Sequence, residues 1–182
     1  SQYADSLIMA TEKADRLEKK LADNCRAYGD ITSFINTDYH SIKQTLDEKE
    51  VLIDFTDYML ENRTRKYAAY IINRNQQYPL LQPLFTEHEI DSLQITRPDM
   101  YYDKEHAQDI IKLLWLPLKT QVAEGSTVYY VPSQLLFKMA PESLPLDDGS
   151  LLGDHYKFVR LSSAREIPDA KQNLPLPTVA LK

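Results

Sequence analysis

The first part of the chain places apolar or small residues three and four positions apart. They recur from Leu7 to Leu21, and the pattern continues from Cys25 to Tyr28. This spacing predicts an amphipathic helix with one buried stripe and a solvated, charged remainder. Gly29 follows the last apolar position and predicts the end of the helix, because glycine enters the left-handed conformation at little cost. A second, shorter helix is predicted over 38–48, so we expect residues 1–48 to form a helical arm.

After residue 50 the hydrophobic pattern becomes that of β-strands. Two runs rich in β-branched and aromatic residues, 51–56 and 67–72, flank a polar turn and predict an antiparallel hairpin. A third run, 78–85, contains Pro79 and Pro83. Proline cannot donate a backbone hydrogen bond to a neighbouring strand, so this run is predicted to be an edge strand. We therefore expect a three-stranded meander.

The next segment alternates helix and strand patterns. Thr86 and Glu89 have the spacing of a capping box and predict the start of a short helix. A longer helix is predicted over 104–122, with one broad apolar face that packs on the sheet and a kink at Pro117. Further strands are predicted over 127–131, 135–139 and 155–161. The expected fold class is α/β, an N-terminal helical arm followed by a mixed sheet with helices packed on it.

The last residues differ from both patterns. Segment 167–182 contains three prolines and no periodicity, which predicts an extended linker. Val179 to Leu181 then has the pattern of the first residues of another strand, so we expect the natural protein to continue past Lys182. The expected organisation is a helical arm over 1–48, an α/β subdomain over 49–166 and a linker over 167–182.

Composition narrows the classes of partner and compartment. The 182 residues are 43% hydrophobic and 26% charged, enough to bury a core, and the net charge is −6 with dispersed cations. This balance disfavours nucleic acid and anionic membranes as partners. The single cysteine cannot form an internal disulfide, and the sequence shows neither a signal peptide nor an apolar run of the roughly 20 residues that span a bilayer. We expect a cytoplasmic protein.

Metal and phosphate sites have no clear candidate in the sequence. The four glycines do not form a phosphate-binding loop, and the four histidines lie far apart. His88–Glu89 followed by Asp91 is the nearest approach to a metal motif, but no second histidine stands at the required interval. We interpret this segment as a capped surface helix and expect no metal or other cofactor.

Nucleophilic catalysis is also poorly supported. Cys25 falls in the apolar stripe, where a core role is the better interpretation. Ser162–Ser163 lacks the Gly-x-Ser-x-Gly elbow of a nucleophilic serine. Asp147–Asp148 precedes Gly149, a combination typical of a turn rather than of an acid/base pair. We assign no catalytic, cofactor-binding or metal-binding residue in this chain.

The most distinctive segment is Val128–Pro145. It resembles the strand, turn and second strand of the bacterial CHAT family, caspase-like domains commonly found after tetratricopeptide repeats. The family pattern reads roughly Tyr-Phe-Ser-Pro-Asp-Gly-Leu-Leu, then a few residues, then Glu-Ala-Leu-Pro. The matching positions are Pro132, Leu135, Leu136, Ala140, Glu142, Leu144 and Pro145. Ser133–Gln134 replaces the Asp-Gly of the turn.

Other segments resemble the same family in the same order. Glu50–Phe55 is similar to its Glu-x-x-Ile-Glu-Phe, and Tyr67–Tyr70 to its Tyr-x-Ala strand. Leu114–Leu118 is similar to its Ile-Trp-Lys-Pro-Leu, and Arg160–Arg165 to its Arg-x-Ser-Ser-x-Arg. The resemblance covers nearly the whole chain.

The resemblance implies where the family's chemistry is carried. In the CHAT family the catalytic His follows a later strand in a His-Gly pair, and the catalytic Cys follows another strand beyond it. This sequence has no His-Gly pair and no cysteine after Cys25. The chain therefore resembles the non-catalytic, pseudo-caspase half of a CHAT-domain protein whose full-length form is a caspase-like cysteine peptidase. The implied partners are proteins: its own upstream repeats, its downstream catalytic half and a peptide substrate.

A second hypothesis is a protein–protein interaction scaffold with no associated protease activity. The apolar stripe over 7–28 could dock a repeat array or a second copy of the chain, or pack within the chain onto the sheet. The sequence leaves these alternatives, and the oligomeric state, open.

Overall fold

The computed structural model describes residues 11–17, 19–20, 37–168 and 171. The chain divides into two compact units, Ser1–Asp38 and Tyr39–Lys182. In the first unit, residues 11–17 and 19–20 are helical, as the spacing predicts for that range. They are all exposed, so the predicted stripe is not buried there, and its residue Leu17 is 52% exposed. The stripe positions Leu7, Leu21 and Cys25, and the predicted stop Gly29, lie outside the described residues.

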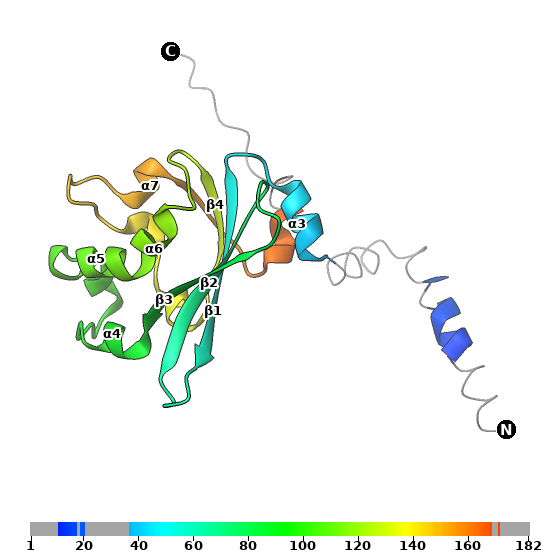
Figure 1. Ribbon diagram of the computed structural model, residues 1–182, viewed down its shortest axis with the longest axis horizontal. Helices are drawn as coiled ribbons and strands as arrows, with labels where there is room; N and C mark the ends of the chain where they lie inside the picture. The colour runs from blue at the N-terminus through cyan, green and yellow to red at the C-terminus, as the bar shows by residue number, and fades with distance from the viewer. Residues whose placement is uncertain (1–10, 18, 21–36, 169–170, 172–182) are drawn as a thin grey trace, which may run out of the picture. The chain divides into compact units, whose positions relative to one another are not determined.

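The second unit is built on a five-stranded mixed sheet (Figure 1). Its strands are β1 (Glu50–Met59), β2 (Arg65–Asn73), β3 (Leu80–Thr86), β4 (Thr127–Val131) and β5 (Lys157–Arg160), in the order β3-β2-β1-β4-β5. β1, β2 and β3 pair antiparallel, while β4 pairs parallel to β1 and β5 parallel to β4. The predicted meander is confirmed, with its proline-containing strand at the edge, and so is the mixed α/β class.

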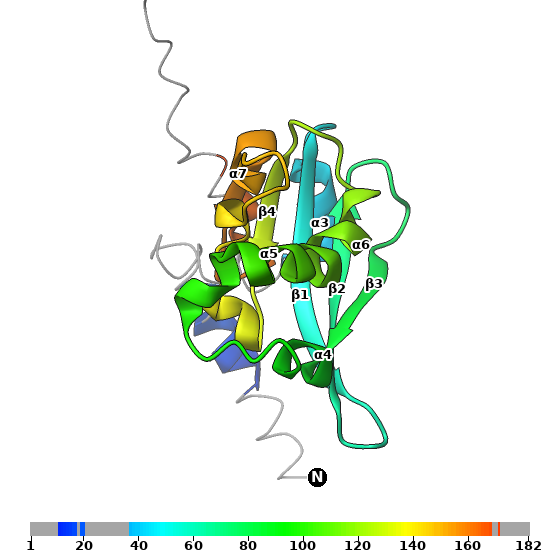
Figure 2. The same cartoon turned by 90° about the vertical axis from the view of Figure 1, so that its left-hand side faces the viewer.

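Helices cover one face of the sheet throughout and the other face only in part. Figures 1 and 2 show α4 (Glu87–Asp91), α5 (Lys104–Ile110), α6 (Leu116–Lys119) and α7 (Leu152–His155) on one side. On the opposite side lie α3 (Tyr39–Thr45) and the 3-10 turn Ala164–Glu166 (Figure 1). Further 3-10 helices span Pro98–Tyr102, Gln134–Lys138 and Pro141–Ser143.

Two cores result, because successive side chains of a strand project to opposite faces. Val51, Ile53 and Phe55 of β1 belong to the larger core, which also includes Ile110 of α5 and Leu118 of α6. Leu52 belongs to the smaller core with Ile42 of α3. Burial on both faces explains why the first half of β1 is a nearly continuous apolar run rather than an alternating one.

The predicted long helix is in its expected place but is divided. α5 is followed by the π-helical turn Ile111–Trp115 and then by α6. Pro117 has no N–H to donate within the helix, and the preceding N–H, that of Leu116, donates to Ile111 O, five residues back. Leu114 and Leu118 are fully buried against the sheet. The predicted packing is confirmed, and the predicted kink takes the form of a π turn.

Three sequence predictions are corrected by the structure. The strand predicted over 135–139 is wrong, since this segment is the 3-10 helix Gln134–Lys138, with Leu136 buried and Phe137 exposed. The strand predicted over 155–161 is shorter, because His155 ends α7 and β5 begins at Lys157. The helix predicted over 38–48 is likewise shorter and ends at Thr45.

Candidate functional site

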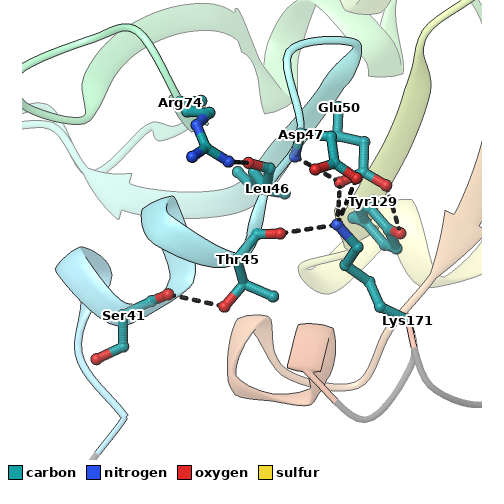
Figure 3. Close-up of polar contacts among 8 residues, drawn as sticks. All are labelled: Ser41, Thr45, Leu46, Asp47, Glu50, Arg74, Tyr129 and Lys171. Carbon is teal, nitrogen blue, oxygen red and sulfur yellow. Dashed lines mark hydrogen bonds and ion pairs between the residues drawn. The ribbon is translucent and has the colours of Figure 1, made fainter.

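The most complete polar site of the second unit is formed around Lys171, in the segment that follows β5 (Figure 3). The Lys171 ammonium donates to Thr45 O at 2.7 Å, Asp47 Oδ2 at 2.8 Å and Glu50 Oε2 at 2.7 Å. An ammonium group has three protons, so each is used. We call Thr45, Asp47, Glu50 and Lys171 the lysine clamp. It joins the end of α3, the start of β1 and the segment after β5.

The clamp also completes the end of α3. The last carbonyl groups of a helix have no partner within the helix, and their partial negative charge favours a cation nearby. Lys171 supplies that cation at Thr45 O, and Arg74 Nη1 donates to the next carbonyl, Leu46 O, at 3.1 Å. Two cations from distant parts of the chain therefore hold this helix end.

Glu50 is the buried centre of the clamp. Its side chain is 13% exposed. Oε1 accepts a hydrogen bond from the Tyr129 hydroxyl at 3.1 Å, and Oε2 accepts from the backbone N–H of Asp47 at 2.7 Å as well as from Lys171. Both carboxylate oxygens are therefore paired, which offsets the cost of burying the charge.

The electrostatics of the clamp favour its charged form at neutral pH. The hydrogen bond and charge of Lys171 hold the pKa of Asp47 below its usual value. Desolvation opposes ionisation of Lys171, but its bonds to Asp47 and Glu50 outweigh this and raise the pKa of the ammonium. Burial and the neighbouring Glu50 carboxylate raise the pKa of the Tyr129 phenol. With its donors paired and no group poised to exchange a proton, the clamp is suited to holding segments together.

A second candidate is a cavity of about 460 Å³ beside the carboxyl ends of β1 and β4, the edge at which open α/β sheets bind ligands. Its lining includes Arg65, Tyr67, Glu87, Tyr101 and Lys138. Arg65 forms an ion pair with Asp57. Burial raises the pKa of both phenols, so they are neutral hydrogen-bonding groups at physiological pH. The lining mixes cations, anions and phenols and contains no nucleophile paired with a base.

A third candidate, which sequence reasoning missed, is the chain of contacts through His155. Ser150 Oγ lies 2.9 Å from His155 Nε2, and His155 Nδ1 lies 3.0 Å from Glu124 Oε1. The order of groups matches that of a serine-hydrolase triad. Sequence offered no signal for it, because Glu124 is 31 residues from His155 and the Ser150 segment has no nucleophile motif.

The hydrogen bonds of Ser150 argue against its activation as a nucleophile by His155. The hydroxyl donates to Asp148 Oδ1 at 2.6 Å, and a hydroxyl group has only one proton to donate. The Ser150 hydroxyl is therefore an acceptor towards the His155 ring, the reverse of what general-base activation requires. The contacts tie the 147–151 turn to the loop before β4.

The residues weighed from the sequence lie in structural roles. Thr86 and Glu89 form the predicted capping box at the start of α4, with Thr86 N donating to Glu89 Oε2 at 2.7 Å. Gly149 has φ +86°, so the interpretation of Asp147–Asp148 as part of a turn is confirmed. Ser163 Oγ accepts from the backbone N–H of Arg165 at 3.3 Å. Cys25 lies outside the described residues.

Metal sites and membrane-spanning helices are absent from the described residues. Within residues 11–17, 19–20, 37–168 and 171, no group of three or more His, Cys, Asp or Glu side chains is placed to hold a metal ion. In the same residues, no helix has both the length and the apolar character that crossing a membrane requires. No protein-family model and no curated protein matches the chain.

Proposed function

We propose that this chain is a non-catalytic structural and regulatory segment of a CHAT-domain protein whose full-length form is a caspase-like cysteine peptidase. The proposal rests on the motifs quoted from the sequence and on the elements that carry them. Glu50–Phe55 lies on β1, Tyr67–Tyr70 on β2 and Leu114–Leu118 at the π turn and α6. Val128–Val131 lies on β4.

The lysine clamp is the observation that carries the regulatory part of the proposal. α3 directly follows the first unit in the sequence, and Lys171 belongs to the segment that leads away from β5. Their direct contact, through Thr45 O and the ammonium, means that a displacement of α3 changes the position of the departing segment. A scaffold between upstream repeats and a downstream catalytic half needs such a connection.

The chemistry of the proposed peptidase belongs to residues outside this chain. In a cysteine peptidase a thiolate supported by an imidazole attacks the peptide carbonyl carbon. The part of the present chain is to hold the segment that leads to those residues in a fixed place relative to β1 and α3.

The test uses the longer protein that the proposal implies. Replacement of its downstream cysteine by alanine should abolish peptide cleavage, and unchanged cleavage would refute the peptidase assignment. In the same protein, Lys171→Met should lower kcat/KM for a peptide substrate, whereas Lys157→Met, a change of an exposed lysine on β5, should not. Equal activity of these two variants would refute the regulatory role of the clamp.

The second hypothesis, an interaction scaffold without peptidase activity, is favoured by one observation. Part of the sheet face that carries α3 exposes large apolar side chains, among them Tyr70 and Leu81. Binding of a protein partner by a full-length form that cleaves no peptide would select this hypothesis over the first.

A further inference from the structure

Half of one sheet face has no helix of the second unit against it. Figure 1 shows α3 beside the upper parts of β1 and β2, and no described element of the second unit on that side of their lower parts. Directly paired residues of neighbouring strands project to the same face. The register pairs Asp54 with Tyr70 and Tyr70 with Leu81, and it pairs Thr56 with Ala68 and Ala68 with Pro83. We call the part of this face formed by Asp54, Thr56, Tyr58, Tyr70, Leu81 and Pro83 the open face.

The open face is apolar and accessible. Tyr58 is 41% exposed, Tyr70 44% and Leu81 46%, and they lie on three adjacent strands. Large apolar side chains gathered in one exposed patch are typical of a surface that binds a partner.

Asp54 lies at one end of this patch, beside Tyr70 in the register. It is half-buried, and among the described residues no group forms a hydrogen bond or ion pair with its carboxylate. Desolvation raises the pKa of Asp54, and no cation offsets that effect. An unpaired carboxylate between apolar side chains is unfavourable in the free chain. A cation brought by a partner would remove that cost.

Lys66, a cation on the same face of the sheet, lies too far from Asp54 to pair with it. Lys66 pairs with Tyr58 in the register, four residues along β2 from Tyr70, which is about 13 Å at the rise of a strand. There Lys66 lies by Glu89, whose pKa is lowered by hydrogen bonds with Thr86 and, to a smaller extent, by Lys66.

We propose that the open face docks an amphipathic α-helix of a partner protein, and that this helix carries one Lys or Arg in its apolar stripe opposite Asp54. A helix suits the surface because the face presents side chains from three strands rather than a free strand edge, and helices already pack in this way on the other face of the sheet. A long basic side chain can lie along Tyr70 with its apolar stem and place its charge at the carboxylate. A second copy of the chain fits less well, since it would bring a second Asp54.

The experiment measures binding of two labelled synthetic peptides to the full chain by fluorescence anisotropy. Both are 20-residue helices with the same leucine stripe, one with Lys and one with Glu at its centre. We expect the Lys peptide to bind at least about 10-fold more tightly than the Glu peptide. Asp54→Asn should weaken binding of the Lys peptide about 10-fold, while Asp147→Asn, a change of an exposed carboxylate in a turn, should have no effect.

A second pair of variants tests the apolar part of the surface. Tyr70→Glu should abolish binding of both peptides, and Tyr78→Glu, at a tyrosine that is more exposed but not on the open face, should leave it intact. Because both tyrosines are exposed, each variant is expected to keep the thermal unfolding transition of the unchanged chain.

Several results would overturn the proposal. They are failure of the Lys peptide to bind, equal binding of the two peptides, or unchanged binding after Asp54→Asn. A dimer in light scattering that Tyr70→Glu converts to a monomer would assign the open face to a second copy. Tighter peptide binding after Leu17→Asp would assign it to a segment of the same chain.

Discussion

The lysine clamp allows a quantitative prediction for Lys171→Met, which keeps most of the length of the side chain and removes its charge. Hydrogen bonds that involve a charged group contribute about 1.5–3 kcal/mol to stability. The bond to Glu50 dominates, because Glu50 is 13% exposed, whereas Asp47 is 69% exposed and is screened by water. Ordering the segment around Lys171 offsets part of the gain, at roughly 1 kcal/mol per residue. We expect a net loss of about 1.5 kcal/mol.

The loss should be visible in thermal unfolding followed by circular dichroism. For a chain of this size, about 1.5 kcal/mol corresponds to a decrease in Tm of roughly 3–6 °C. Lys157→Met is the matched control, since Lys157 is exposed and forms no ion pair in the described part of the chain. Its Tm should change by less than about 1 °C.

The pH dependence of the difference follows from the pKa shifts. The pKa of Asp47 is lowered on folding, so its contribution is present above the ordinary value of 3.8 and is lost as the pH falls through the folded-state pKa. The pKa of Lys171 is raised, so its contribution is present below 10.5 and is lost as the pH rises through the folded-state pKa. The difference in stability between the unchanged chain and Lys171→Met should therefore be constant between about pH 5 and 9. Equal Tm values for Lys171→Met and Lys157→Met at pH 7, or a difference that grows as the pH falls below 3.8, would refute the reasoning.

Three further changes test other parts of the fold. Asp54→Asn should stabilise the chain by about 0.5–1 kcal/mol at pH 7 in urea unfolding, because it removes an unpaired, half-buried charge. Since the pKa of Asp54 is raised on folding, this gain in stability should vanish below about pH 4, where the carboxyl group is neutral in both states. Gly153→Ala would place its Cβ 2.9 Å from Glu142 O, and we expect a loss of about 1–3 kcal/mol, which an unchanged Tm would contradict. His155→Gln should change the stability by less than about 1 kcal/mol, since Glu124 is largely exposed, and a larger loss would show that the contacts with Ser150 and Glu124 stabilise the fold more than surface contacts do.

Patterns within short stretches of sequence correctly predicted those elements that depend on residues close to one another in the chain. The hairpin of β1 and β2, the edge position of β3 and the capping box at Thr86 are each specified within a few residues of sequence, and each is confirmed. The strand predicted over 135–139 is wrong because five residues, four of them apolar, show no periodicity that separates a strand from a 3-10 helix. Gln134, at φ +47°, begins this helix in a conformation that few residues adopt.

The candidate site depends on contacts that local patterns do not contain. Lys171 lies 126 residues from Thr45, and nothing in the composition of the linker marks it as the partner of a helix end. Asp54 did carry a signal, since it is a charged residue inside the apolar run Val51–Phe55. A charged residue is unfavourable in a strand that is buried on both faces. Its presence in the sequence therefore indicates that one face of β1 is not fully covered at this position.

The contact between Thr45 and Lys171 also determines how the second unit would respond to mechanical load. The first helix of this unit, α3, and its last described residue, Lys171, meet at one place. Tension applied between α3 and Lys171 is transmitted through the ammonium group to Thr45 and to Glu50 at the start of β1, and the other four strands lie outside this path. Under force the hydrogen bonds of Lys171 should break before the sheet separates. The unit would then lengthen by releasing its end segment while both cores stay folded.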